Sequence, residues 1–128
     1  TIEIDNPNVT DVSIRDFIVD AKKIVVLSSQ NLIKGNWSRI KDIKAINEDC
    51  KKKGVPFVVI CGATREEINA FRKKHGLYAP FFVNDETELK AITRSNPSIL
   101  VIEKGVVKAK YPFRTIPNKE DFNKKHLN

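Results

Sequence analysis

The stretch Asn96-Pro97-Ser98-Ile99-Leu100-Val101-Ile102-Glu103-Lys104-Gly105-Val106-Val107 decides the fold of this 128-residue chain. Residues 98–102 form an apolar, β-branched run that is typical of a buried strand. The sequence Glu103-Lys104-Gly105 predicts a turn, and residues 106–111 predict the antiparallel strand that returns beside the first one. The chain therefore closes with a β-hairpin, and Pro117 and Asn118 then lead into a final helix that holds Phe122.

Upstream of this hairpin, two buried strands alternate with two amphipathic helices. Residues 24–27 and 56–61 are the β-branched and aromatic runs of central strands. An apolar stripe with helical spacing lies between them and ends at Gly54, which stops the helix at its C-terminal cap. The stripe consists of Trp37, Ile40, Ile43, Ile46 and Cys50. A second helix begins with a Thr64–Glu67 capping box and ends at Gly76.

The weaker elements complete the order. Residues 1–5 alternate as a short edge strand, residues 11–20 and 85–92 predict short helices, and residues 80–83 predict a short strand. Strands that alternate with helices favour parallel pairing with right-handed crossovers, and the late hairpin adds antiparallel strands. We therefore predict an α/β fold with a mixed central sheet in one domain. Its parts are an N-terminal extension (1–22), a core (23–111) and a C-terminal loop and helix (112–128).

The composition is that of a globular protein with a basic surface. Hydrophobic residues make up 41% and charged residues 30% of the chain, and the formal net charge is +7. The lysines are spread along the chain, mostly at expected helix ends, where cations meet the negative end of the helix dipole. No apolar run approaches the roughly 20 residues that span a bilayer. The chain contains no methionine, so we expect it to be part of a longer polypeptide.

The hairpin and the strand before it resemble a known family. Residues 96–107 resemble the G-x-P-T-x-F-L-I-D-x-x-G-x-I signature of thioredoxin-like proteins, and residues 57–85 resemble the middle of the peroxiredoxin-like and TlpA-like branch. The likeness covers residues 23–111. It implies a thioredoxin-like fold, a cis Asn96–Pro97 peptide bond, and a substrate groove faced by Asn96.

The chain departs from this family at the position of the reactive cysteine. The family carries that cysteine just after the first core strand, at the start of the long helix, where the helix dipole lowers the thiol pKa. Here the position reads Ser28-Ser29-Gln30-Asn31, followed by residues 32–36, and contains no cysteine. A serine hydroxyl cannot form the sulfur–sulfur intermediates of thiol exchange. The resemblance thus implies the scaffold and a groove at residues 28–31, Asn96 and Pro97, without the redox chemistry.

A narrower resemblance concerns the helix start Asp85-Glu86-Thr87, residues 89–92 and residues 94–97. These resemble the thioredoxin-like domain that follows a DoxX-like membrane region in some bacterial proteins, which also tends to lack the cysteine pair. The resemblance implies a domain tethered to the membrane in the full-length protein, with the cytoplasmic side favoured. It also implies that the partner is a protein or the membrane-embedded region of the same polypeptide.

The two cysteines, Cys50 and Cys61, stand eleven positions apart. They form neither a CxxC pair nor a zinc site, since no histidines cluster with them. Cys50 continues an apolar helical stripe and Cys61 ends a buried strand, so we expect both thiols to be reduced and buried. Of the two, Cys61 is the candidate that could reach the groove, because it ends a strand parallel to the one before Ser28.

Other chemistries lack their motifs. His75 lies at a helix end, where it can hydrogen-bond the last carbonyls, and His126 lies in a tail that we expect to fray. There is no Walker loop, no G-x-G-x-x-G and no G-x-S-x-G elbow. We expect no metal and no cofactor. Three hypotheses remain: a non-catalytic interaction module, an atypical thiol oxidoreductase using Cys61 or Cys50, and a basic module for nucleic acid or anionic lipid. We favour the first.

Overall fold

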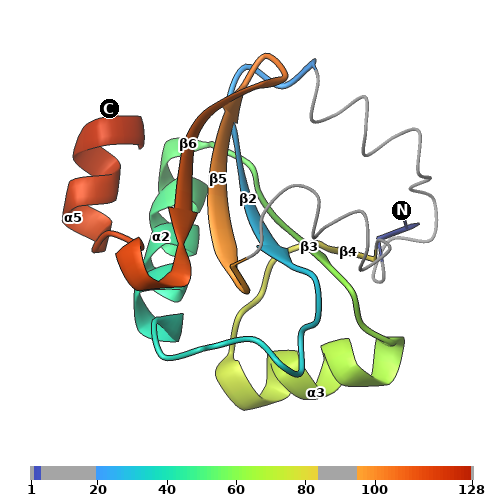
Figure 1. Ribbon diagram of the computed structural model, residues 1–128. Helices are drawn as coiled ribbons and strands as arrows, with labels where there is room; N and C mark the ends of the chain where they lie inside the picture. Colours follow the sequence, from blue (N-terminus) through green and yellow to red (C-terminus); the bar gives the residue numbers. More distant parts are fainter. Residues whose placement is uncertain (1, 4–19, 84–94, 128) are drawn as a thin grey trace.

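The computed structural model describes residues 2–3, 20–83 and 95–127, which form a mixed sheet flanked by helices (Figure 1). Within these residues, six strands lie in the order β1-β4-β3-β2-β5-β6. The strands are β1 (Ile2–Glu3), β2 (Ile24–Ser29), β3 (Phe57–Cys61), β4 (Phe81–Val83), β5 (Ser98–Glu103) and β6 (Val106–Pro112). The helical segments are α2 (Ile40–Lys53), α3 (Arg65–His75), the 3₁₀ turn η1 (Phe113–Thr115), α5 (Lys119–Phe122) and the closing π-helical turn η2 (Asn123–Leu127).

The sheet is mixed, as the sequence predicts. Strands β2, β3 and β4 run parallel to one another. Strand β5 is antiparallel to both β2 and β6, and β1 is antiparallel to β4. Apart from Asp20, the expected helices at 11–20 and 85–92 lie outside the described residues. The two carboxyl ends of β2 and β3 meet at one edge, and the antiparallel β5 brings its amino end to that same edge.

The two described helices of the core follow their sequence signals closely. Gly54 adopts the left-handed conformation after α2 (φ 71°), and its N–H bonds the carbonyl oxygens of Cys50 and Lys51. The capping box of α3 is present, because the Thr64 side chain accepts from the Glu67 N–H and the Glu67 carboxylate accepts from the Thr64 N–H. Helix α2 begins only at Ile40, however. Trp37 precedes the helix because the Asn36 side chain accepts from the Ser38 N–H (3.0 Å) and holds a turn there.

The core lies on both faces of the sheet. On one face, side chains of β2 and β3 pack against α2, with Leu27, Val59, Ile43 and Ile46 all fully buried. On the other face, Ile24, Val26, Val58 and Leu100 form a second buried cluster. Burial on both faces explains why residues 24–27 and 98–102 are continuous apolar runs, because every side chain of such a strand contacts the core.

The expectation that the C-terminal tail frays is wrong. Phe122 is fully buried and packs against the rings of Tyr111 and His126. The Tyr111 hydroxyl lies 2.6 Å from Nε2 of His126 and hydrogen-bonds to it. The Lys23 ammonium donates to the His126 carbonyl, which ties the tail to the start of β2. The sequence after Phe122 did not predict this packing, because it is mostly polar and only His126 and Leu127 make the contacts.

Candidate functional site

The polar residues that follow β2 meet the residue before Pro97 at one edge of the sheet. The Ser29 hydroxyl donates to Oδ1 of Asn96 over 2.6 Å. The Nδ2 amide of Asn96 donates in turn to the Asn31 carbonyl over 2.7 Å. Three of the residues predicted to form the groove, from two segments 67 positions apart, are therefore joined in one hydrogen-bonded cluster. We call Ser29, Asn31, Asn36 and Asn96 the polar clamp.

Backbone hydrogen bonds hold the same loop against three strand ends. The Asn36 N–H donates to the Asn96 carbonyl over 2.9 Å, which completes the polar clamp. The Gly62 N–H donates to the Ser29 carbonyl (2.9 Å), and the Leu32 N–H donates to the Gly62 carbonyl (3.1 Å). Hydrogen bonds to Gly62 and Asn96 thus hold the loop after β2 in place. The Asn96 carbonyl accepts one of these bonds, from the Asn36 N–H.

Pro97 directly follows Asn96 of the polar clamp. The Asn96–Pro97 bond is cis, as predicted, and Pro97 is buried. Its carbonyl accepts from the Ser95 hydroxyl over 3.1 Å, and the Ser95 Oγ accepts from the Phe113 N–H over 3.2 Å. The amino end of β5 is therefore fixed to the segment that follows β6.

Ser28 and Gln30 do not share the geometry of Ser29. Successive side chains of a strand point to opposite faces of its sheet, so Ser28 lies on the face away from Ser29. Its hydroxyl is buried and has no hydrogen-bond partner within the described part of the chain. The Gln30 side chain is also buried, at 6% exposure. The two residues line the strand end rather than the polar clamp.

Both cysteines are free and buried, as predicted. Cys61 lies in register with Ser29 on the neighbouring strand, beside the polar clamp. Burial, with a further contribution from the Glu67 carboxylate, raises the pKa of the Cys61 thiol to about 12. Burial and the Asp49 carboxylate raise the pKa of Cys50 to about 12 as well. Neither thiol is accessible, since both residues have 0% exposure.

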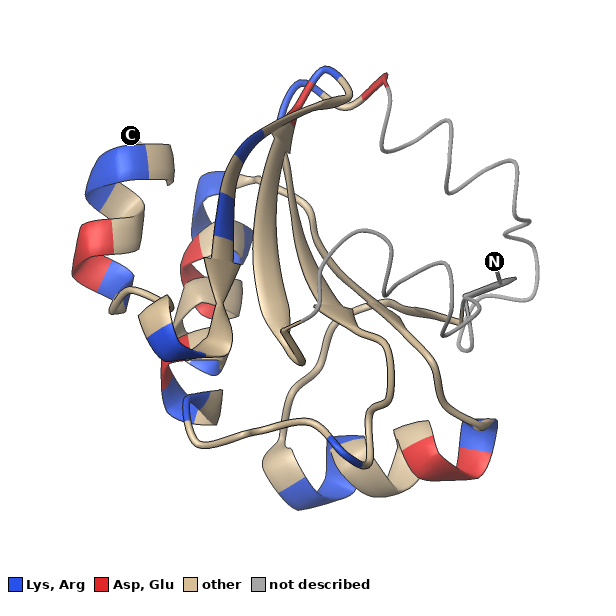
Figure 2. Cartoon of the chain, viewed as in Figure 1, with Lys and Arg blue, Asp and Glu red and all other residues tan. Residues whose placement is uncertain are grey.

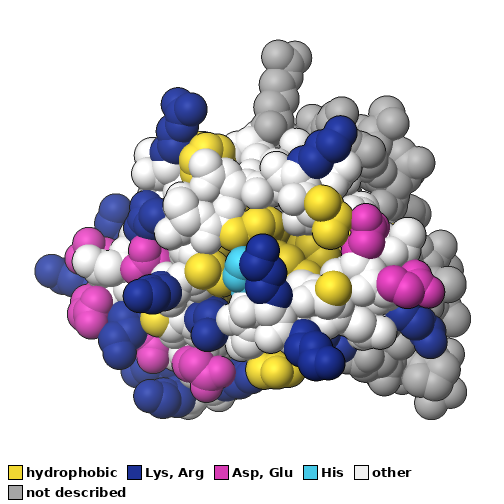
Figure 3. Space-filling view, turned by 90° about the horizontal axis from the view of Figure 1, so that it is seen from below, with side chains coloured by type: hydrophobic (Ala, Val, Ile, Leu, Met, Phe, Trp, Pro, Cys, Tyr) yellow, Lys and Arg dark blue, Asp and Glu magenta, His cyan; other side chains and the backbone are white. Residues whose placement is uncertain are grey.

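An aromatic wall, formed by Trp37, Phe71 and His75, borders the loop. The Trp37 and Phe71 rings meet edge to face with centroids 4.6 Å apart, and the His75 ring lies 4.6 Å from that of Phe71. Burial, followed by the charges of Lys74 and Lys44, lowers the pKa of His75. The sequence places Trp37 and Phe71 on separate helical stripes, so it contains no signal that they meet. Figure 3 shows apolar side chains gathered in a hollow on this face, with a histidine at its edge.

Gly35 allows the indole to lie flat against the loop. A Cβ atom at this position would lie 2.8 Å from the Trp37 Nε1, which donates to the Leu32 carbonyl over 2.9 Å. We expect Gly35→Ala to lower the free energy of unfolding by about 1–3 kcal/mol, because the ring must leave its place. Urea denaturation followed by tryptophan fluorescence measures the loss. An emission spectrum identical to that of the native chain at unchanged stability would contradict this packing.

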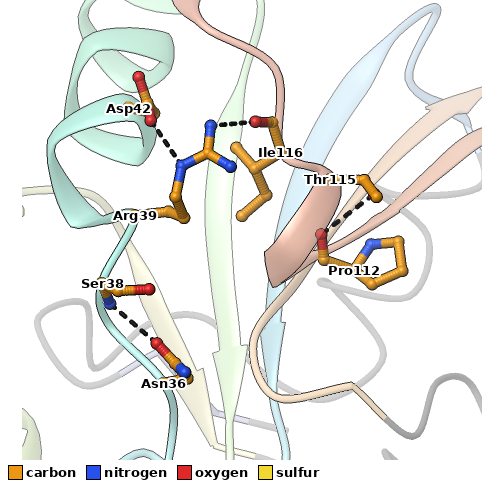
Figure 4. Close-up of polar contacts among 7 residues, drawn as sticks. All are labelled: Asn36, Ser38, Arg39, Asp42, Pro112, Thr115 and Ile116. Carbon is orange, nitrogen blue, oxygen red and sulfur yellow. Dashed lines mark hydrogen bonds and ion pairs between the residues drawn. The ribbon is translucent and has the colours of Figure 1, made fainter.

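The far end of the loop is anchored on the C-terminal segment (Figure 4). The Arg39 Nε lies 2.8 Å from the Asp42 carboxylate, and its guanidinium also donates to the Ile116 carbonyl. The Thr115 hydroxyl donates to the Pro112 carbonyl over 3.3 Å in the same region. Arg39 therefore links the start of α2 to the loop before α5, and the site loop is fixed at both ends.

Within residues 2–3, 20–83 and 95–127, no group of three or more histidine, cysteine or acidic side chains could hold a metal ion. None of the helices in these same ranges has the length and hydropathy that a bilayer span requires. The candidate site thus consists of the polar clamp, the buried Cys61 and the aromatic wall.

No family model matches the chain, and no curated protein matches it either. Several solved structures, however, resemble this chain. StoA from Bacillus subtilis is 11% identical over 82% of each chain, with a TM-score of 0.62. A secreted thiol-disulfide isomerase from Corynebacterium glutamicum is 16% identical, covering 98% of this chain and 78% of its own, with a TM-score of 0.64. A thiol:disulfide interchange protein of the thioredoxin family from Chlorobium tepidum is 18% identical, covering 97% and 87%, with a TM-score of 0.64. The α/β architecture that this chain shares with them is the thioredoxin-like fold.

Proposed function

We propose that this domain is a thioredoxin-like binding module that holds a protein partner and does not itself catalyse thiol–disulfide exchange. One observation carries the proposal: the loop after β2, where the sequence resemblance implies a reactive cysteine, contains none. In its place, the polar groups of Ser29, Asn31 and Asn96 satisfy one another. An exchange site needs an exposed thiolate instead.

The existing thiols are poorly suited to replace that cysteine. The nucleophile in exchange is the thiolate. With a pKa of about 12 for Cys61, roughly one molecule in 10⁵ carries the thiolate at pH 7. The residue is also fully buried, so a substrate disulfide must displace part of the fold to reach it.

The apolar hollow beside the aromatic wall supports the binding role. Ile33, on the site loop, is 60% exposed although it is a large aliphatic residue. Trp37 and His75 are both half-buried and keep ring surface at the border of the loop. Exposed apolar surface next to a rigid polar rim is typical of protein interaction sites. The occupant we propose is an apolar segment of a protein partner.

That partner is either a separate protein or a membrane-embedded region of the same polypeptide, as the DoxX-like resemblance implies. A photoreactive residue placed at Ile33 in the full-length protein tests this directly. Crosslinks within the polypeptide would support the second source and crosslinks to another chain the first. The same residue placed at Asn69, exposed on α3, is the matched control.

A thiol oxidoreductase that works through Cys61 is the alternative function. It rests on the register of Cys61 with Ser29, which places the sulfur at the edge of the site. The alternative requires that the carboxyl end of β3 opens far enough to expose this sulfur. Catalysis that depends on Cys61 separates it from the binding module.

We expect insulin reduction and peroxide consumption by the native chain to remain at the uncatalysed background. The gain-of-function counterpart is Asn31→Cys combined with Lys34→Cys. The Lys34 N–H donates to the Asn31 side chain over 3.1 Å, so these positions lie close enough for a CxxC disulfide. We expect the double variant to form this disulfide and to reduce insulin above background, because the scaffold is that of the oxidoreductases.

The serine pair Asn31→Ser and Lys34→Ser controls for loss of the native side chains and is expected to stay at background. Turnover by the native chain that disappears in Cys61→Ser would overturn the non-catalytic proposal. A double-cysteine variant that folds but remains inactive would show that the loop differs from the oxidoreductases in geometry as well as in residues.

A further inference from the structure

A cavity of about 820 Å³ lies at the end of the sheet opposite the candidate site. Strand β2 runs from Ile24 to Ser29. The cavity is lined by the residues just before this strand, whereas the polar clamp begins at its last residue. Three segments form the walls: residues 21–23 before β2, residues 53–56 from the end of α2 onward, and residues 103–108 around the turn between β5 and β6. Its volume is within the range of small-molecule sites, roughly 300–1,000 Å³.

The walls of the cavity are strongly basic. They carry five lysines against one carboxylate, that of Glu103. The lysines are Lys22, Lys23, Lys53, Lys104 and Lys108. Lys23 lies 3.4 Å from Glu103 and neutralises it. The other four are exposed and form no ion pair within the described part of the chain. Figure 2 shows blue segments of the β5–β6 turn, of β6 and of the end of α2 on this side of the molecule.

One of these lysines occupies an unfavourable backbone conformation. Lys104 has φ 50° and Gly105 has φ 80°, so both residues of the turn are left-handed. Such two-residue turns favour Asn-Gly, because a longer side chain is disfavoured at positive φ. The Lys104 N–H also donates to the Ala21 carbonyl over 3.0 Å, which fixes the turn over the cavity. A charged residue thus lines the cavity at a position where asparagine suits the backbone better.

Apolar side chains are exposed on both faces of the same hairpin tip. Val106 is 55% exposed and lines the cavity, and Val107 is 49% exposed. Neighbouring residues in a strand point to opposite faces, so the two valines flank the tip. Clustered lysines attract an anionic leaflet, and exposed aliphatic side chains beside them add apolar contact with its interface.

We propose that this lysine-lined cavity binds the phosphate headgroup of an anionic lipid, with the hairpin tip entering the bilayer interface so that Val106 and Val107, on its two faces, both contact it. The charge supplies the attraction to an anionic leaflet, and the valines supply apolar contact that a soluble phosphate does not need. None of the residues that line the cavity is aromatic, so bases of a nucleic acid have no stacking surface there. The proposal is independent of the function assigned to the opposite end.

Cosedimentation with vesicles tests the charge. The probes are vesicles of phosphatidylcholine alone and of phosphatidylcholine with one quarter phosphatidylglycerol. We expect binding only to the second kind. In a triple variant, Lys53→Gln, Lys104→Asn and Lys108→Gln, we expect affinity to fall by on the order of 100-fold, since each lysine near an anionic surface contributes about fivefold. Asparagine at position 104 suits the turn, so this variant remains folded.

The matched control removes three cations from α3, at the other end of the sheet: Arg65→Gln, Lys73→Gln and Lys74→Gln. All three are exposed, and we expect at most a threefold loss, through net charge alone. An equal loss in both triple variants would overturn the proposal, because it would show a response to net charge and not to a site.

The valines distinguish a lipid from a soluble anion. We expect Val106→Thr combined with Val107→Thr to weaken vesicle binding by roughly tenfold, whereas binding of glycerol phosphate, ATP or RNA would not depend on these methyl groups. Binding of a soluble phosphate or RNA in the absence of vesicles, unchanged by the threonine pair and abolished by the lysine triple variant, would overturn the lipid assignment.

Discussion

Native Cys50 and Cys61 are expected to react with iodoacetamide at pH 8 about 1,000-fold more slowly than in the urea-unfolded chain. Folding raises the pKa of both thiols from 9.0 to about 12, mainly by burial. At a pH below the pKa, raising the pKa by one lowers the thiolate fraction about tenfold. The rise from 9.0 to about 12 therefore lowers the alkylation rate about 1,000-fold. Mass spectrometry of timed, quenched samples measures both rates in one experiment.

Ile33→Cys is the internal control, because position 33 is 60% exposed on the loop next to the polar clamp. The introduced thiol should react at close to the rate of the unfolded chain. If Cys61 reacted as fast as the thiol at position 33, it would be accessible in the native state. That result would support the alternative function, in which Cys61 is the nucleophile of a thiol oxidoreductase.

The same pKa shifts fix the sign of a stability change with pH. The folded state binds the thiol protons more tightly, so this contribution is fully present below pH 9 and is lost as the pH rises from 9.0 toward about 12. Urea denaturation between pH 8 and 11 should therefore show a decline that is shallower in Cys61→Ala. An equal slope in the two proteins would contradict the burial of this thiol.

Asn96→Ala is expected to lower the free energy of unfolding by about 3 kcal/mol, because two hydrogen bonds are lost at once. The substitution removes the acceptor of the Ser29 hydroxyl (2.6 Å) and the donor to the Asn31 carbonyl (2.7 Å). Ser29 has 0% exposure, so its hydroxyl then remains buried and unsatisfied. Denaturation in urea measures the loss, and hydrogen exchange at the Asn36 amide reports whether the loop opens.

A double-mutant cycle with Ser29→Ala isolates the interaction between the two side chains. We expect the double variant to lose about 1 kcal/mol less stability than the two single variants lose together. The reason is that Ser29→Ala removes the hydroxyl that Asn96→Ala leaves without an acceptor. Asn69→Ala, on the exposed face of α3, is the matched control and should change stability by less than about 0.5 kcal/mol. Additive losses at Ser29 and Asn96 would contradict the polar clamp.

The elements that sequence analysis placed correctly are those with strong local signals. The Thr64–Glu67 capping box and the glycine stops at Gly54 and Gly76 depend on neighbouring residues alone, and the structure confirms all three. The apolar runs of β2 and β5 predict central strands because both of their faces are buried. The family likeness of residues 96–107 added the cis bond before Pro97.

The arrangement of the site was predictable only in part. The resemblance placed residues 28–31 and Asn96 at one groove, and the structure brings Ser29, Asn31 and Asn96 together. The pairing of particular atoms depends on tertiary geometry, as does the meeting of Trp37 with Phe71 from separate elements. The packing of His126 on Tyr111 was missed for the same reason.

The polar clamp also determines when during folding the site can exist. Ser29 and Asn96 are 67 residues apart in the chain, and their bond forms only after the antiparallel pairing of β2 with β5. Contacts of such long sequence separation are slow to form, because the entropy of closing the intervening loop must be overcome first. The site is therefore a late product of folding. A fragment that ends before β5 would retain the loop after β2 and its hydrogen bonds to Gly62, and would lack every bond to Asn96. Local opening of β5 would likewise break the polar clamp.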